Sequence, residues 1–100
     1  MDEDIVEQVQ TVTSIHETLT GYTGKRLRIR ANMGRSKIVE REGVLTQVHP
    51  SLFIVETLEK RGRKARQSYQ YVDVLTGMVE LTDLETNELL FPEIQEEVLQ

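Results

Sequence analysis

The chain has 100 residues and a formal net charge of −5 at pH 7, and it contains no cysteine. This length suits a single domain with one hydrophobic core, and the lack of cysteine excludes disulfides, thiolate metal sites and thiol catalysis. The charge is sorted, because all twelve Lys and Arg residues lie between Lys25 and Arg66 and thirteen of the seventeen Asp and Glu residues lie in the flanks. A basic centre of this kind attracts phosphates or acidic proteins.

The first predicted element is an amphipathic helix over residues 3–19. Its apolar residues recur at spacings of three and four, and Gly21 is expected to end it. The apolar stripe consists of Ile5, Val9, Val12, Ile15 or His16, and Leu19. Several Thr and Ser residues weaken the intrinsic helix propensity, so we expect the helix to depend on docking this stripe, either against its own barrel or against a second copy of the chain.

At Lys25 the hydrophobic period changes from 3.6 to 2, which predicts a strand with one face in the core and one face covered by arginine. The alternating positions are Leu27, Ile29 and Ala31 against Arg26, Arg28 and Arg30. A turn at residues 32–35 follows, with Gly34 able to take a positive φ.

Four more strands are predicted, over residues 36–48, 52–58, 65–71 and 78–82, with a short turn at 72–76. Gly43 is expected to mark a bulge or bend in the first of these strands. Five short strands with a central bend predict a mainly β protein with an N-terminal α-helix, built as a small five-stranded SH3-like or Sm-like barrel.

The predicted organisation is an amphipathic helix over residues 1–23, the barrel over 24–82 and an acidic tail over 83–100. Apolar residues in the tail are spaced loosely like a helix after Pro92. The sequence leaves two alternatives open for the tail: it docks on the domain, or it is mobile. The acidic start and the lack of a long apolar run lead us to expect a cytoplasmic protein that does not enter a membrane.

Four segments carry a resemblance to a known family: GKRLRIRANMGRSK (24–37), EREGVL (40–45), PSLFIV (50–55) and SYQYVDVLT (68–76). In order and spacing they resemble the Veg family, small proteins of low-GC Gram-positive bacteria that are linked to stimulation of biofilm formation. The resemblance implies a small β-barrel with an amino-terminal helix, a cytoplasmic location and no enzymatic activity. It also implies a regulatory role that relieves a DNA-binding repressor of biofilm matrix genes.

Ten basic residues are the candidate site, because a small barrel can bring them to one side as a surface for a partner protein or a nucleic acid. They are Arg26, Arg28, Arg30, Arg35, Lys37, Arg41, Arg61, Arg63, Lys64 and Arg66. Arginine outnumbers lysine in the chain by eight to four, which favours bidentate contacts to phosphate or carboxylate. The alternative is that these bases pair internally with Glu40, Glu42, Glu56 and the acidic tail.

Tyr69 and Tyr71 could stack on unpaired bases, but the chain has only five aromatic residues and a barrel core needs some of them, so core packing is the preferred interpretation. His16 and His49 are too isolated for a metal site. We expect no catalytic residues, cofactor or metal.

Two hypotheses remain. The first is a regulatory adaptor that binds a protein, such as a DNA-binding repressor, and the second is a barrel that binds nucleic acid. A homodimer is compatible with either.

Overall fold

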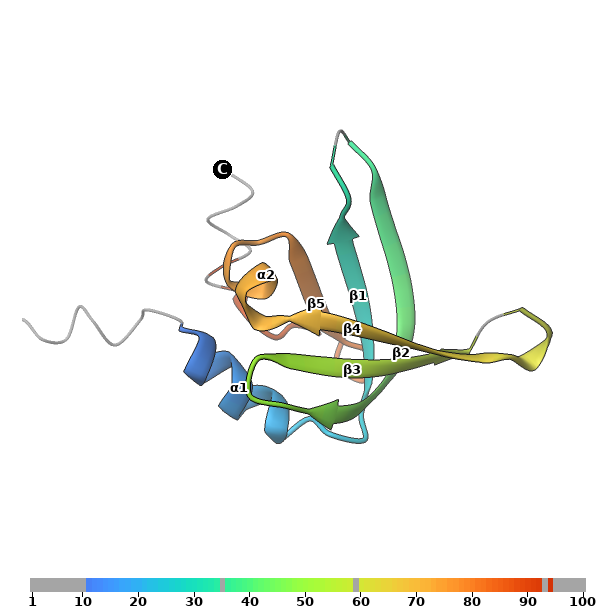
Figure 1. The fold of residues 1–100 in the computed structure, drawn as a ribbon, viewed down its shortest axis with the longest axis horizontal. Helices are drawn as coiled ribbons and strands as arrows, with labels where there is room; N and C mark the ends of the chain where they lie inside the picture. The colour runs from blue at the N-terminus through green and yellow to red at the C-terminus, as the bar shows by residue number, and fades with distance from the viewer. Residues whose placement is uncertain (1–10, 35, 59, 93, 95–100) are drawn as a thin grey trace, which may run out of the picture.

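The computed structural model describes residues 11–34, 36–58, 60–92 and 94. Its elements are α1 (Val12–Thr20), β1 (Arg26–Asn32), β2 (Ile38–Val48), β3 (Leu52–Leu58), the 3₁₀ turn η2 (Lys60–Gly62), β4 (Lys64–Gln70), α2 (Tyr71–Leu75), β5 (Val79–Asp83) and β6 (Glu88–Leu89). The strands form one antiparallel sheet in the order β4-β3-β2-β1-β5-β6. The sheet is strongly bent, and the β1–β2 and β3–β4 hairpins project from the body in different directions (Figure 1).

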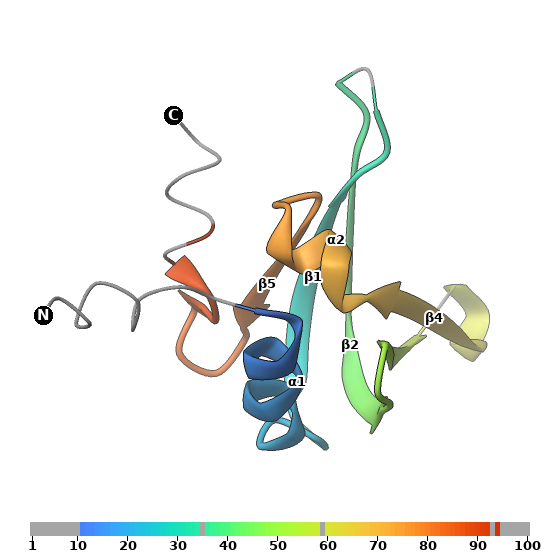
Figure 2. The same ribbon diagram turned by 60° about the vertical axis from the view of Figure 1, so that its left-hand side comes forward.

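The predicted N-terminal helix is confirmed over Val12–Thr20, and it ends at Gly21 as expected. Thr11 caps it reciprocally with Ser14: the Thr11 hydroxyl accepts from the Ser14 N–H at 3.1 Å, and the Ser14 hydroxyl accepts from the Thr11 N–H at 2.8 Å. Ile15 and Leu19 are fully buried, so this part of the stripe is docked on the chain's own core. The helix lies on the same side of the sheet as α2 (Figure 2).

The helical positions predicted upstream, including Ile5 and Val9, lie outside the described residues. The docking of α1 is therefore established along its described length, from Val12, which packs against the core, to the buried Leu19.

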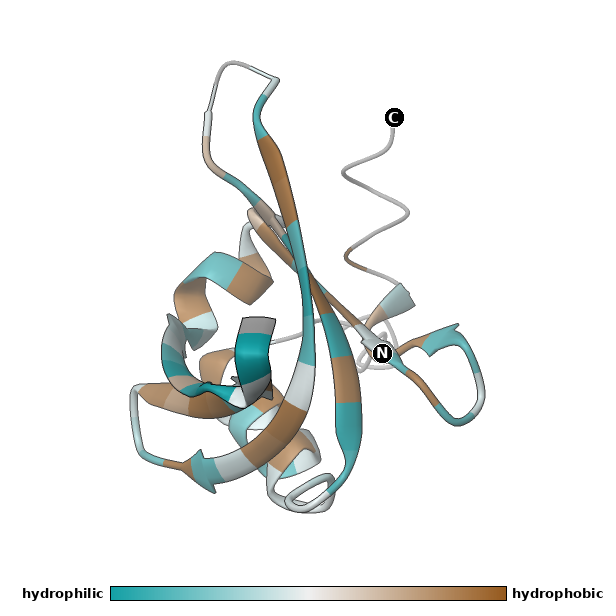
Figure 3. Cartoon of the chain, turned by 90° about the vertical axis from the view of Figure 1, so that its right-hand side faces the viewer, coloured by the Kyte–Doolittle hydropathy of each residue, from teal (hydrophilic) through white to brown (hydrophobic). Residues whose placement is uncertain are grey.

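Strand β1 has the predicted phase. Leu27 and Ile29 are buried on one face, and the alternate arginines lie on the other face. Brown and teal segments alternate along the long strands when the chain is coloured by hydropathy (Figure 3). The period-two pattern therefore determined which side of this strand enters the core.

Gly43, where a bulge or bend was predicted, pairs in regular register with Leu27 and Thr57 and lies at a close contact between β2 and β3. A Cβ at this position would lie 2.5 Å from the Glu56 carbonyl oxygen and 2.7 Å from Val55 Cγ1. Glycine is therefore required by space and not by a positive φ. A register shift between Leu45 and Gln47 adds a bulge farther along β2, which increases the local twist and lets one long strand take part in both halves of the sheet.

Both candidate tyrosines pack on Phe53, which confirms core packing as their role. The ring centroids of Phe53 and Tyr69 are 5.7 Å apart, and those of Phe53 and Tyr71 are 5.6 Å apart. Tyr71 is fully buried, whereas Tyr69 is half-buried. The fourth strand ends earlier than predicted, because Tyr71 begins α2, and the turn predicted at 72–76 is mostly this short helix.

The mainly β class with an N-terminal helix is confirmed, and the strand count differs slightly, because the described residues form six strands in one open sheet where five strands were predicted. After β5 the chain turns on Asp83, whose side chain accepts from the Glu85 N–H at 2.8 Å and whose carbonyl accepts from the Asn87 N–H at 2.6 Å. The returning chain forms β6 beside β5. Strand β6 therefore pairs with part of the β5 edge that faces away from β1.

The described part of the predicted acidic tail belongs to the domain. Phe91 and Ile94 are buried in the core, and Pro92 and Ile94 have helical backbone. Residues 95–100 lie outside the described part of the chain. No helix within the described ranges is long and apolar enough to cross a membrane.

Candidate functional site

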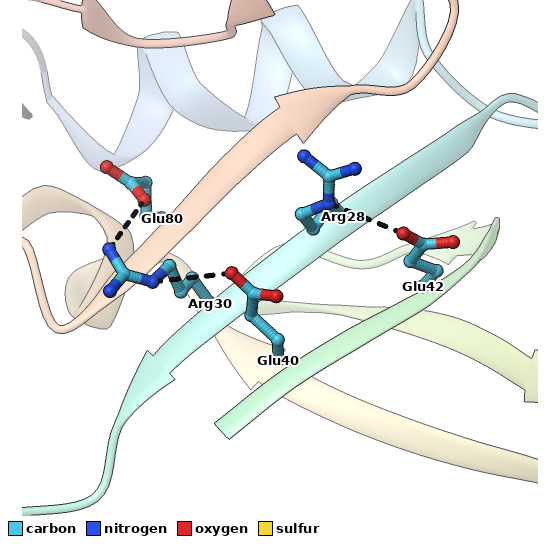
Figure 4. Close-up of polar contacts among 5 residues, drawn as sticks. All are labelled: Arg28, Arg30, Glu40, Glu42 and Glu80. Atoms are coloured by element: carbon cyan, nitrogen blue, oxygen red, sulfur yellow. Dashed lines mark hydrogen bonds and ion pairs between the residues drawn. The ribbon is translucent and has the colours of Figure 1, made fainter. Parts of the chain in front are cut away.

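Ion pairs between neighbouring strands lie on the outer face of the sheet, and three of them are drawn in Figure 4. Arg28 Nε lies 3.4 Å from Glu42 Oε2. Arg30 contacts two carboxylates, since its Nε lies 3.5 Å from Glu40 Oε2 and its Nη1 lies 3.7 Å from Glu80 Oε1. The sheet register produces this arrangement, because Arg28 is opposite Glu42 in β2, and Arg30 is opposite Glu40 in β2 and Glu80 in β5.

The sequence left two interpretations of the basic residues open, a binding surface and internal ion pairs. The contacts of Arg28 and Arg30 agree with internal pairing. Two carboxylates flank Arg30, and a third pairs with Arg28. These three acidic side chains balance the two arginines, so the middle of the outer face has no excess of positive charge. The side chains are about half exposed, and ion pairs of this kind typically contribute less than about 1 kcal/mol each to folding. Their main effect is on the electrostatic surface that a partner meets.

Arg41 lies on the opposite face of the sheet from the arginines of β1. It pairs in register with the buried Ile29, so its side chain points to the concave side of the bent sheet. There it lies near Tyr69: burial raises the pKa of the Tyr69 hydroxyl, and the positive charge of Arg41 partly opposes this rise. The structure therefore separates Arg41 from the rest of the predicted basic surface.

Two other candidates lie away from the centre of the sheet. Arg26 is exposed at the start of β1, opposite Val44, and Lys37 is exposed at the tip of the β1–β2 hairpin. Arg35 is outside the described residues. Beside Lys37, the apolar side chains of Met33 and Ile38 are also exposed.

The remaining four candidates gather on the β3–β4 hairpin, and together they are called the basic arm: Arg61, Arg63, Lys64 and Arg66. All four are exposed, and within the described residues none of them forms an ion pair. Leu58 lies opposite Lys64 in the register and its side chain is 72% exposed. The arm therefore presents exposed cations next to an apolar side chain, on an element that projects from the body (Figure 1), with Glu56 of β3 opposite Arg66 in the register.

A groove of about 330 Å³ lies on the concave side of the sheet, between the β1–β2 hairpin, β4 and the start of β5. Its apolar walls are Ala31, Met33, Val39, Met78 and Val79. Arg41 and Asp73 bring one charge of each sign to it. The consecutive residues Gln67, Ser68 and Tyr69 also line it. Neighbouring residues of a strand have side chains on opposite faces, so a groove that contacts all three reaches the edge of β4.

The groove was not predictable from the sequence, because the tertiary fold brings Asp73 and Gln67 near Arg41. The position of Arg41 could have been predicted from the alternation along its strand. Arg41 is two residues before Gly43 and four before Leu45, so it lies on their side of the strand, and Glu40 and Glu42 lie on the other side. In a strand, that phase places it on the core side.

The described residues show no arrangement that suggests metal chemistry. Within these residues, no three His, Asp or Glu side chains gather as a possible metal site. What the surface offers is exposed charge, exposed apolar side chains and a groove beside a strand edge, which are features of binding.

A family model described as "Biofilm formation stimulator VEG" matches residues 10–82 of the chain. The matched region includes α1, both projecting hairpins and α2, and it ends within β5. No match was found among curated proteins.

Proposed function

The chain belongs to the Veg family of biofilm formation stimulators, and from that membership we propose that it is a non-enzymatic regulatory adaptor that acts by binding another protein. The expected partner is a DNA-binding transcriptional repressor. Such a partner places the protein in the cytoplasm. The observation that carries the proposal is the basic arm, in which exposed cations stand beside the exposed Leu58.

A surface of this composition suits a protein partner. Interfaces between proteins combine apolar contacts with hydrogen-bonded Arg side chains, and Arg is enriched among the residues that dominate binding energy. The arm supplies three arginines and one exposed leucine on a single hairpin. Its positive charge also increases the rate of encounter with an acidic surface at low salt.

Nucleic-acid binding is the second candidate function, and the four exposed cations of the basic arm favour it. Two observations speak for a protein instead. Arg28 and Arg30 are already paired with carboxylates in the same sheet. Tyr69 and Tyr71 stack on Phe53, which leaves them poorly placed to stack on bases.

Affinity capture from a cell extract, with and without nuclease, tests the proposal. The arm variant Arg61→Ala/Arg63→Ala/Lys64→Ala is compared with the matched variant Arg28→Ala/Arg30→Ala, which removes paired cations from the same chain. We expect a regulatory protein to be captured equally well after nuclease treatment, to be lost with the arm variant and to be retained with the matched variant.

Capture that disappears after nuclease treatment would instead support nucleic-acid binding. In that case the arm variant should flatten the dependence of affinity on salt by about three ions, as expected from counterion release. Capture that is unchanged by the arm variant would overturn the role assigned to the basic arm.

A further inference from the structure

Strand β4 is a free edge of the sheet. It is seven residues long, and among the described strands it pairs with β3 alone, whereas the opposite edge is formed by β6, which has two residues. A long free edge presents unpaired N–H and C=O groups, and these can accept a further strand.

The hydrogen bonds around β4 show which of its residues offer these groups. The Tyr71 N–H donates toward Ser51, and the Ala65 carbonyl accepts from the Thr57 hydroxyl, so these two residues direct their backbone groups to the β3 side. Backbone direction alternates along an antiparallel strand. The main chains of Arg66, Ser68 and Gln70 therefore point outward, and within the described residues no backbone hydrogen bond from outside the β3–β4 ladder reaches them.

The groove lies directly beside this edge. Ser68 lines it together with its neighbours Gln67 and Tyr69, which have side chains on the other face of the strand. A segment that paired with β4 would place alternate side chains into the groove, against walls such as Val39 and Met78. Because the groove holds one cation and one anion, Arg41 and Asp73, an apolar side chain suits it better than a charged one.

The other face of β4 has a different character. Lys64 and Arg66 project from it, next to Arg61 and Arg63 in the preceding turn. Side chains of an added strand that point to this face would lie opposite or diagonal to these cations, where carboxylates are favoured. An added strand is therefore expected to alternate apolar residues, which face the groove, with acidic residues, which face the cations of the basic arm.

We propose that β4 binds an extended acidic segment of the partner protein by strand addition, and that the segment alternates acidic with apolar residues. The proposal rests on the proposed protein-binding function and names the site and the partner motif. A second copy of the chain is a poorer occupant, because β4 pairing with β4 would bring two sets of Lys and Arg side chains close together.

The test uses two synthetic octapeptides of identical composition, both acetylated and amidated. In one, glutamate alternates with valine, and in the other a block of glutamates precedes a block of valines. We expect the full-length protein to bind the alternating peptide about tenfold more tightly than the block peptide. Its binding should slow amide hydrogen exchange at Arg66, Ser68 and Gln70.

A matched pair of variants tests the backbone contact. Ser68→Pro removes an outward N–H and should abolish binding of the alternating peptide, whereas Ser68→Ala keeps the N–H and should bind it like the unchanged protein. Because proline can itself disturb a strand, N-methylation of the peptide provides a second measurement on the unchanged protein. Methylation of one alternate set of peptide amides should abolish binding, and methylation of the other set should not.

Equal affinity for the two peptides would overturn the proposal, since it would show attraction to charge without strand pairing. Protection of the same amides in the free protein at raised concentration would also overturn it, because the edge would then be occupied by a second copy.

If Ser68→Pro still captures the regulator that the unchanged protein captures, strand addition is wrong and the adaptor function stands. If the alternating peptide binds but no protein is captured, the adaptor function fails and the strand-accepting site stands.

Discussion

The hydroxyl of Tyr71 donates a 2.6 Å hydrogen bond to the main-chain carbonyl of His49. This contact ties the start of α2 to the turn between β2 and β3. The same ring lies edge-on to His16 of α1, with centroids 5.6 Å apart, and stacks on Phe53 of β3. One side chain therefore connects the N-terminal helix, the second helix and the bent part of the sheet.

The first prediction concerns that hydrogen bond. Tyr71→Phe keeps the ring contacts but leaves the His49 carbonyl without its partner, and it should lower the free energy of unfolding by about 1 kcal/mol. Urea unfolding followed by circular dichroism measures the change. Tyr22→Phe, which alters a half-buried tyrosine outside this contact, serves as the control and should change the midpoint less. Equal shifts in both variants would contradict a specific role for the Tyr71 hydroxyl.

The second prediction concerns stability at alkaline pH. Burial raises the pKa of both Tyr69 and Tyr71 above the ordinary value of 10.0. The folded state therefore favours the neutral phenol: its contribution is fully present below pH 10.0 and is lost as the pH rises through the raised pKa. Unfolding free energies measured across this range should fall above about pH 10, and less steeply in Tyr71→Phe. A fall of the same steepness in both proteins would argue against burial of this hydroxyl.

The third prediction concerns the bend in β2. Gly43→Ala places a methyl group against the main chain of Glu56, which cannot rotate away, and should destabilise the fold by about 1–3 kcal/mol. Gly21→Ala is the matched control, because its added Cβ would lie 3.5 Å from the Thr18 carbonyl oxygen, an ordinary contact. Thermal unfolding of the two variants distinguishes them. If Gly43→Ala were as stable as Gly21→Ala, β2 and β3 could not approach as closely as described.

The fourth prediction concerns the phase of β1. Leu27→Asp would bury a carboxylate with no cation opposite it, since Leu27 faces Gly43 in β2 and Asp83 in β5, and should cost several kcal/mol, on the scale of about 3 kcal/mol or more for such groups. Arg28→Asp changes an outward-facing residue and should leave the fold intact, with a small loss from repulsion by Glu42. The melting temperatures of the two variants should differ widely, and similar losses would show that the described register is wrong.

The fifth prediction concerns the C-terminal region. Ending the chain after Thr82 removes Asp83, Phe91 and Ile94, all of which are buried, and should destabilise the domain more than Phe91→Ala alone, which is expected to cost about 3–5 kcal/mol. Ending the chain after Ile94 keeps all three residues and is the matched control. Denaturant unfolding of the three proteins should give stability in the order Ile94 end, Phe91→Ala, Thr82 end. Full stability of the shortest chain would mean that the region after β5 is dispensable for folding.

Most elements were predictable because their signals are local. The alternation from Leu27 to Ala31, the turn after it and the end of the helix at Gly21 depend on neighbouring residues in the chain. The sixth strand was not predictable in the same way. It is two residues long, and it exists because Asp83 turns the chain and β5 offers an edge to pair with.

The candidate site was predictable in composition but not in arrangement. The sequence showed that the bases are concentrated in the centre of the chain and that arginine covers one face of β1. It could not show that Glu40, Glu42 and Glu80 lie opposite those arginines. The pairing depends on the register between β1 and its two neighbours, and one of these, β5, is far from β1 in the chain.

By itself, the sequence determined the period of each main element, the phase of β1 and the sorting of charge, since backbone sterics and alternation act over a few residues. Tertiary structure alone decided which cations are neutralised, which form the basic arm, and that Arg41 faces a groove. It also decided that β4 lies at an edge of the described sheet, because the strand order depends on pairing between segments that are far apart in the chain, such as β1 with β5.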